Sequence, residues 1–225
     1  MMLENLNIRQ ATFNDIEFVI EAIIESEKSG SDVISSCKIF GLTEDKFKEV
    51  LREVLAQDDI EGYDYCLSGF IIAENNGEYV GALGSFYENS ETPSGRIKAT
   101  ILFQYLDKSK MKEISKNSRI IKGITPGREP GCLQLEHGYV REQYRRKGIF
   151  LTLIKENIKR NLGMYSFPKV QGILFKDNYK SYNAHLKFGY KVVDERRVND
   201  SEIFNFFPYD TKVLMELNQD KFPKI

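Results

Sequence analysis

Apolar residues recur with two different periods along this chain, and the change of period separates predicted helices from predicted strands. The segment "NLNIRQAT" favours a first strand, and Thr12 or Asn14 is expected to cap the helix that follows it. A second helix is predicted after Thr43, with Glu44 and Asp45 in its first turn. The stripe of the first helix is Ile16, Val19, Ile20, Ile23 and Ile24, and that of the second is Phe47, Val50, Leu51, Val54 and Leu55.

The middle of the chain changes to the shorter period of strands. The stretch "GFIIAENNGEYVGALGSFY" holds two apolar segments around Asn75, Asn76 and Gly77, residues that tolerate the positive φ of tight turns, and it predicts a hairpin. Residues 88–131 contain two loop-like stretches around a run long enough for one or two helices. With no repeat and no linker composition, we expect one domain over 1–225, in which 88–131 is a partly helical insertion.

The last third begins with an alternating strand, "CLQLEHGYV". A helix is expected from Gly148 onward, then a strand at "VQGILF", a short helix at "NYKSYNAHLKFGYK" that ends at Gly189, and two final strands at "YKVVDERRV" and "KVLMELN". Strict alternation in the first of these strands puts Leu133, Leu135, His137 and Tyr139 on one face, and Gln134, Glu136, Gly138 and Val140 on the other.

A basic turn, "YVREQYRRKGIF", joins that strand to the following helix. The N-terminus of a helix carries unpaired N–H groups and a partial positive charge, so Arg145, Arg146, Lys147 and Gly148 favour binding of a pyrophosphate there. Simple solvation of an exposed basic turn is the alternative. The spacing differs from a P-loop, and no GxGxxG follows the first strand, which disfavours nucleoside triphosphates and dinucleotides.

Composition narrows the classes of partner. The chain has 225 residues, 41 % of them hydrophobic, and a formal net charge of −1, so no overall field favours nucleic acid or an anionic membrane. Three separated cysteines and two distant histidines disfavour a metal site and a disulfide framework. No signal-peptide core or membrane-length apolar run is present, and we therefore expect a cytoplasmic protein.

Two spaced motifs together resemble the GCN5-related N-acetyltransferase family. The first, Arg145 to Phe150, matches the family pattern of Arg or Gln, two residues, Gly, one residue, then Gly or Ala, at Arg145 and Gly148. The second is similar to the family's later pattern at Asn178, Ser181, His185 and Gly189-Tyr190. The resemblance covers roughly residues 8–87 and 132–217. Phe150 replaces the usual small residue, and His185 replaces the usual tyrosine.

The resemblance implies an α/β fold with a mixed, mostly antiparallel sheet flanked by helices and a splay between the fourth and fifth strands. It also implies that acetyl-coenzyme A lies in that splay as co-substrate. Its expected binding residues are Tyr139, Val140, Arg145, Arg146, Lys147, Gly148, Ile149, Phe150, Asn178 and Ser181. The predicted function is transfer of the acetyl group to a primary amine. The alternative is a non-catalytic acyl-coenzyme A binding module, which Phe150 and His185 keep open.

Acetyl transfer requires removal of a proton from the amine and return of one to the departing thiolate. Glu136 occupies the position where many relatives carry a glutamate base, although it can equally lie on a solvated strand face. His137 is expected to be a packed, hydrogen-bonded core residue. A backbone N–H near Val140 is expected to polarise the carbonyl.

Two residues are candidates for the general acid, His185 and, one helical turn earlier, Tyr182. Either one can instead be a packing residue. The aromatic run "EIFNFFPYD" is a candidate lining of the acceptor pocket, with mutual packing as the alternative. The acceptor itself stays open between a small molecule and a peptide, and a homodimer is possible.

Overall fold

The computed structural model describes residues 5–57 and 61–223, apart from the side chains of residues 113, 119 and 120. Its strands are β1 (Leu6–Gln10), β2 (Phe70–Asn75), β3 (Glu78–Tyr87), β4 (Leu133–Val140), β5 (Lys169–Phe175), β6 (Lys191–Arg197) and β7 (Thr211–Asn218). Its α-helices are α1 (Ile16–Lys28), α2 (Ser35–Phe40), α3 (Glu44–Leu55), α4 (Ser94–Leu102), α5 (Met111–Ile124), α6 (Ile149–Leu162) and α7 (Tyr179–Phe188).

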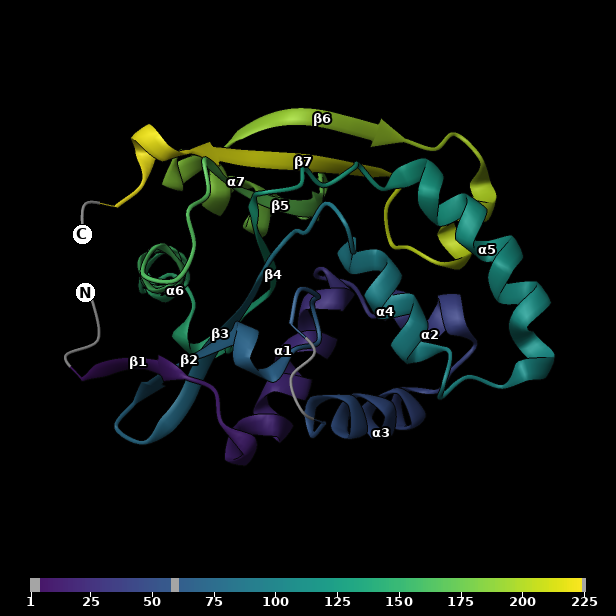
Figure 1. The fold of residues 1–225 in the computed structure, drawn as a ribbon, viewed down its shortest axis with the longest axis horizontal. Helices are drawn as coiled ribbons and strands as arrows, with labels where there is room; N and C mark the ends of the chain where they lie inside the picture. Colours follow the sequence, from purple (N-terminus) through teal and green to yellow (C-terminus); the bar gives the residue numbers. More distant parts are fainter. Residues whose placement is uncertain (1–4, 58–60, 224–225) are drawn as a thin grey trace.

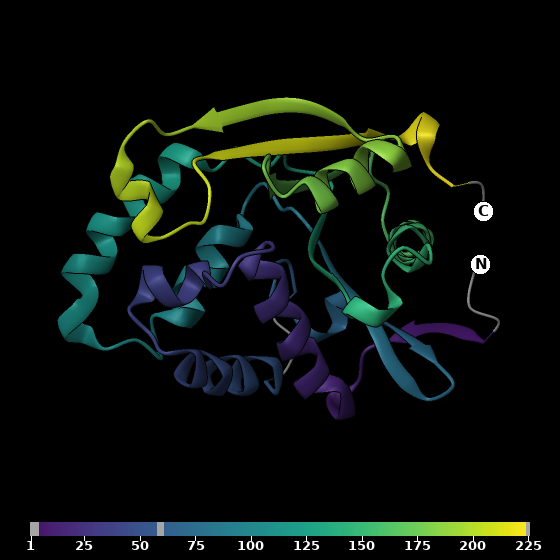
Figure 2. The ribbon, with the colours of Figure 1, turned by 180° about the vertical axis from the view of Figure 1, so that it is seen from behind.

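The strands form one seven-stranded sheet in the order β1-β2-β3-β4-β5-β7-β6. All neighbouring pairs are antiparallel except β4 and β5, which are parallel. This confirms the predicted fold class. In Figures 1 and 2, α1 and α3 lie on one face of the sheet and α6 on the other, with α2, α4 and α5 gathered at one end.

Most predicted elements agree with the structure, because each has a strong local signal. Thr43 caps α3 by accepting a bond from the Lys46 N–H at 3.2 Å, and the β2–β3 turn uses Asn76 and Gly77 at φ of 53° and 79°. Residues 88–131 contain two helices, α4 and α5. Helix α2 is missing from the sequence prediction, because six residues reading "SSCKIF" are too few to show a helical period.

The start of α1 differs in detail from the prediction. Thr12 caps a single 3₁₀ turn over Phe13–Asp15, and the Asp15 side chain bonds back to the Thr12 N–H at 2.7 Å. Asp15 then stands at the N-cap position of α1 itself, in place of Thr12 or Asn14. The chain therefore enters the helix through one extra turn.

Two apolar layers hold the helices against the sheet. On one face, α1 and α3 pack on Phe70, Ile72 and Ala82. On the other, α6 packs against Leu133, Leu135 and neighbouring strand residues. A third cluster joins the end of α5 to β5 and to the β6–β7 connection; its buried members are Ile124, Phe175, Ile203 and Phe207. Within the described residues, no helix is long and apolar enough to cross a bilayer.

Candidate active site

Strands β4 and β5 pair over only two positions and then separate. The ladder is limited to Leu133↔Val170 and Gln134↔Gln171, although β4 continues to Val140 and β5 to Phe175. Beyond Gln134, the backbone groups of β4 that face β5 lose their partner strand. This is the splay that the sequence resemblance implied, and it opens a strand edge in the middle of the sheet.

A bulge in β4 lies beside this opening. On the β3 side, Glu136 pairs with Gly84 and Tyr139 with Ala82, so that His137 and Gly138 together oppose one residue. His137 has a φ of 52°, a conformation that is uncommon for a residue with a side chain.

The bulge corrects the predicted faces of β4. Leu133, Leu135 and Val140 pack in the α6 layer, and a Cβ at Gly138 would meet Phe150 and Leu83 of that layer. His137 and Tyr139 instead face α1. The prediction that His137 and Tyr139 share a face with Leu133 and Leu135 was wrong, because the extra residue of a bulge reverses the alternation.

His137 is held by contacts on both ring nitrogens and by two stacked aromatic rings. Its Nδ1 lies 3.0 Å from Ser26 Oγ and its Nε2 lies 3.3 Å from Asp64 Oδ2. The rings of Tyr65 and Phe70 stack on it with centroids at 5.5 and 6.2 Å. His137 is therefore a packed, hydrogen-bonded residue, as expected, and its contacts stabilise the bulge.

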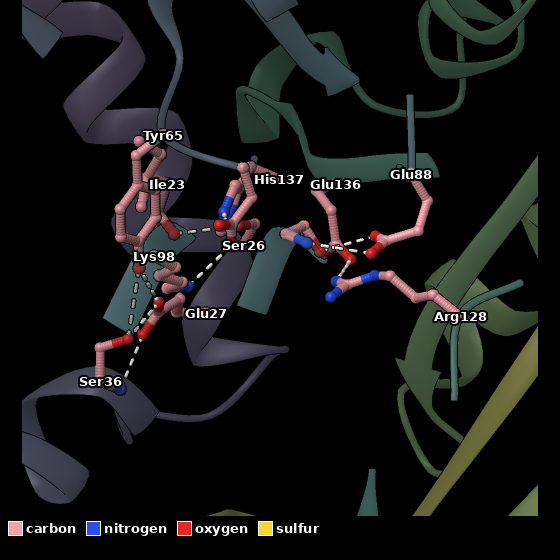
Figure 3. A network of polar contacts seen from close by, with 12 residues as sticks. Ile23, Ser26, Glu27, Ser36, Tyr65, Glu88, Lys98, Arg128, Glu136 and His137 are labelled. Atoms are coloured by element: carbon pink, nitrogen blue, oxygen red, sulfur yellow. Dashed lines mark hydrogen bonds and ion pairs between the residues drawn. The ribbon is translucent and has the colours of Figure 1, made fainter. Parts of the chain in front are cut away.

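Figure 3 shows the larger polar network around His137. Lys98 from α4 forms an ion pair with Asp64 at 2.6 Å and stands over the Tyr65 ring at 4.0 Å. Glu27 of α1 accepts bonds from the Ser36 N–H at 2.8 Å and from the Tyr65 hydroxyl at 3.1 Å. The network thus joins α1, α2, α4 and the bulge into one unit.

Glu136 is next to His137 and forms an ion pair with Arg128, which lies in the loop between α5 and β4 (Figure 3). Only 16 % of its side chain is exposed, so it is not a solvated surface residue. Arg128 also stacks over the Phe86 ring at 5.3 Å. Arg128 could not be predicted from the sequence, because nothing in "TPGREPG" indicates that its arginine turns back toward the sheet.

The basic turn lies where β4 passes into α6. Gly148 is the N-cap of α6 with a φ of 83°, and a Cβ there would meet no atom within 4 Å. Arg145 and Arg146 are exposed, and Arg145 Nε donates to the Val140 carbonyl at 2.9 Å. Lys147 Nζ stands 5.0 Å over the Tyr144 ring. An open helix N-terminus with three neighbouring cations fits a pyrophosphate group.

Among the other expected cofactor residues, Tyr139 turns its side chain away from the splay. Its hydroxyl bonds to Glu21 at 3.1 Å, and burial together with that carboxylate raises the pKa of Tyr139 to about 12. Only its backbone is therefore available as a cofactor contact. Val140 packs in the α6 layer, and Ile149 is buried there.

Asn178 and Ser181 lie at the start of α7. The side-chain Oδ1 of Asn178 caps the helix by accepting from the Ser181 N–H at 3.4 Å, which leaves the Nδ2 amide for another partner. Tyr182 is half-buried in the α6 layer. These residues and the basic turn belong to neighbouring elements, since α6 and α7 contact each other.

His185 is buried on α7, at the point where β4 and β5 separate. A Cβ built on Gly172 of β5 would lie 3.7 Å from His185 Nε2 and 3.6 Å from the Leu135 carbonyl of β4. The Nδ1 atom lies 2.8 Å from the Ser181 carbonyl, which can only accept, so Nδ1 carries the proton. Burial lowers the pKa of His185. The neutral ring therefore presents Nε2 as an acceptor.

Phe150 lies between Gly138 of β4 and His185 of α7. Its ring occupies the place where a Cβ of Gly138 would stand, at 2.5 Å from the ring atom Cε2, and it meets the His185 ring edge-on at 5.5 Å between centroids. The bulky residue at this position thus narrows the opening between β4 and α7. Among the described residues, no group of three or more potential ligands is arranged to hold a metal ion.

Comparisons with solved structures agree with this geometry. An N-acetyltransferase from Staphylococcus aureus Mu50 is similar over 94 % of this chain and 100 % of its own, with 13 % identity and a TM-score of 0.62. The protein yncA from Salmonella typhimurium, a putative acetyltransferase solved with acetyl-CoA, is similar over 99 % and 98 %, with 15 % identity and a TM-score of 0.52. An agmatine N-acetyltransferase variant covers 96 % of this chain and 100 % of its own, with 14 % identity and a TM-score of 0.57.

No protein-family model matches the sequence, and neither does any curated protein sequence. At 13–15 % identity, the structural likeness establishes the fold alone. The chain has the fold of the GCN5-related N-acetyltransferases.

Proposed function

We propose that the protein is an acetyl-coenzyme A dependent N-acetyltransferase that acts on the primary amine of a small molecule or peptide. The single observation that carries this proposal is the combination of a β4–β5 splay with an open, basic helix N-terminus at its end. The splay supplies unpaired backbone groups, and the turn supplies N–H donors and cations. Acetyl-coenzyme A would contribute an acyl group activated as a thioester.

In this proposal the chain's own residues have distinct tasks. Arg145, Arg146, Lys147 and the N–H groups of α6 hold the pyrophosphate, Asn178 Nδ2 binds the pantetheine arm, and the β4 edge near Val140 donates an N–H to the carbonyl oxygen. Glu136 receives the proton of the amine, directly or through water.

The proton for the departing thiolate comes from α7. At neutral pH the His185 ring is uncharged, and its one N–H is bonded to the Ser181 carbonyl. These two facts favour Tyr182 as donor and leave His185 Nε2 as an acceptor beside the splay. His185 stays the second candidate, since its cationic form carries a proton on Nε2 as well as on Nδ1.

A non-catalytic acyl-coenzyme A binding module is the second candidate function. The Phe150 ring favours it, because this ring stands between Gly138 and His185 in the path that the acyl group would take. In that case the coenzyme would bind at the basic turn without reaching Glu136.

Turnover decides between these functions. Free thiol would be followed with acetyl-coenzyme A and a panel of polyamines, amino acids, aminoglycosides and peptides, while binding is measured separately by the shift of the melting temperature. We expect a melting shift with acetyl-coenzyme A and amine-dependent thiol release. A melting shift without release for any amine would support the binding module, and the absence of both would reject the two proposals together.

A further inference from the structure

Lys212 of β7 lies on the same face of the sheet as Glu136. The Gln134 side chain donates to the Gln171 side chain at 2.9 Å across the β4–β5 ladder, so these two side chains lie on one face of the sheet. Glu136 is two residues after Gln134 on β4 and therefore points to the same face. Gln171, Ile173 and Phe175 alternate along β5, and Phe175 is directly opposite Lys212. Because opposite residues of an antiparallel pair share a face, Lys212 and Glu136 both point to the α1 side, across the splay from each other.

The Lys212 ammonium contacts two aromatic rings and no carboxylate. Its Nζ lies 4.8 Å from the Phe175 centroid and 4.3 Å from the Phe207 centroid. No ion pair or hydrogen bond joins it to any residue that the structure describes. The two other cations of this region differ, since Lys98 is paired with Asp64 and Arg128 with Glu136.

The surroundings make the cationic form of Lys212 costly. Burial lowers its pKa to about 8, and the charges of Arg128 and Lys98 act in the same direction, whereas Glu136 and Glu27 favour the charged form. An anion beside Nζ would offset the cost of burial, as carboxylates do for the other two cations. A negatively charged ligand group beside Nζ would therefore stabilise the charged form of Lys212.

We propose that the acceptor is an amino-acid-like molecule, whose carboxylate binds Lys212 while its amine is presented to Glu136. The inference rests on the proposed function and narrows its acceptor class, because a simple polyamine carries no carboxylate that could bind Lys212. The aromatic faces of Phe175 and Phe207 hold the Lys212 ammonium in place. The carboxylate then completes a charge-assisted hydrogen bond.

The proposal can be tested with pairs of acceptors, in which one member carries a carboxylate and the other lacks it. Lysine would be compared with cadaverine, ornithine with putrescine, and alanine with ethylamine, by kcat/KM for thiol release at a fixed acetyl-coenzyme A concentration. A hydrogen bond to a charged group contributes enough for a preference of about ten- to hundredfold for the carboxylate-bearing member. Equal values within every pair would overturn the proposal.

Two substitutions connect that preference to Lys212. In Lys212→Met the side chain still packs on both rings, and we expect a rise in KM for the amino acids with little change for the amines. Lys212→Arg should recover much of the preference. Lys176→Met is the control, because Lys176 is exposed and paired with Glu195 at 2.8 Å. A uniform fall in kcat for all acceptors of Lys212→Met would make Lys212 a proton-transfer group and would also overturn the carboxylate role.

A binding measurement separates this inference from the proposed function. Nε-acetyl-lysine and N-acetylcadaverine would be titrated calorimetrically into wild type and Lys212→Met, in the presence of coenzyme A. Tighter binding of Nε-acetyl-lysine that disappears in Lys212→Met supports the carboxylate site even if no acceptor is turned over. Equal or absent binding of both compounds contradicts it, whether or not some other amine is acetylated.

Discussion

At the scale of single residues, the Arg128–Glu136 ion pair defines what Glu136 can do. Arg128 bonds to Oε1 of the carboxylate, whereas Oε2 accepts no bond from a described residue and can receive a proton. From the sequence, Glu136 was a candidate base, and a solvated strand face was the alternative. The ion pair with Arg128 could not be predicted, since Arg128 lies in an irregular loop and no hydrophobic period indicates the path of such a loop.

Glu136→Gln is expected to lower turnover by about a hundredfold near neutral pH, the scale of a lost general base. The loss should be largest at low pH, where little of the amine is free, and should shrink as the pH approaches the pKa of the amine. The pH profile of kcat/KM checks this, with retained acetyl-coenzyme A binding. Glu129→Gln is the control, because Glu129 is an exposed carboxylate of the same loop, paired with Lys169. Wild-type rates at every pH would make Glu136 a structural partner of Arg128.

Tyr182→Phe and His185→Phe separate the two acid candidates. If Tyr182 donates the proton, Tyr182→Phe should lose about a hundredfold in kcat at unchanged coenzyme affinity. If the cationic His185 is the donor, wild-type activity should fall as the pH rises through a pKa below 6.5, because burial lowers that pKa. His185→Phe would then carry the loss. Near-normal kcat in both single variants would show that neither hydroxyl nor imidazole is the acid.

At the scale of elements, the sequence predicted those turns and helix ends that depend on the conformational preference of a single residue. The β2–β3 turn, the Thr43 cap and the Gly189 helix end each follow from a residue's own conformational preference. The reversal of faces in β4 could not be predicted in this way. It depends on the bulge at His137, which is stabilised by Ser26, Asp64, Tyr65 and Phe70, residues far away in the chain.

The N-terminus of α6 offers a test of the phosphate site in which only charge changes. Gly148 has a positive φ and open space around it, a conformation that both Asn and Asp tolerate. Gly148→Asp places a carboxylate at the phosphate position and should abolish the melting shift caused by acetyl-coenzyme A, whereas Gly148→Asn should retain most of it. Equal shifts in two folded variants would remove the pyrophosphate from this turn.

At the scale of the whole molecule, the buried polar network connects the N-terminal helices to the reacting strand. Within this network Asp64 forms an ion pair with Lys98 of α4 and a hydrogen bond with His137 of the bulge. Burial opposes ionisation of this carboxyl, but the charge of Lys98, the hydrogen bond with His137 and the charge of Arg128 outweigh it and hold the pKa of Asp64 well below its usual range. The geometry of β4 is therefore linked to the ionisation of a residue outside the splay.

This linkage predicts how stability depends on pH. A carboxyl whose pKa is lower in the folded state than in the unfolded chain stabilises the fold fully above its unfolded pKa of about 4, and the contribution is lost as the pH falls toward the folded value. Asp64→Asn removes the charge and leaves Lys98 without its carboxylate. It should lower the free energy of unfolding by roughly 3 to 5 kcal/mol at pH 7, the cost of breaking a buried ion pair.

Denaturant unfolding of wild type and Asp64→Asn between pH 7 and pH 3 measures this contribution. The difference between the two proteins should be constant down to about pH 5 and should narrow below about pH 4, as the wild type binds the proton that the variant cannot bind. Asp220→Asn, a change at an exposed carboxylate near the end of the chain, controls for the loss of one surface charge. A difference that stays the same at every pH would mean that Asp64 stabilises the bulge through shape and hydrogen bonds instead of through its charge.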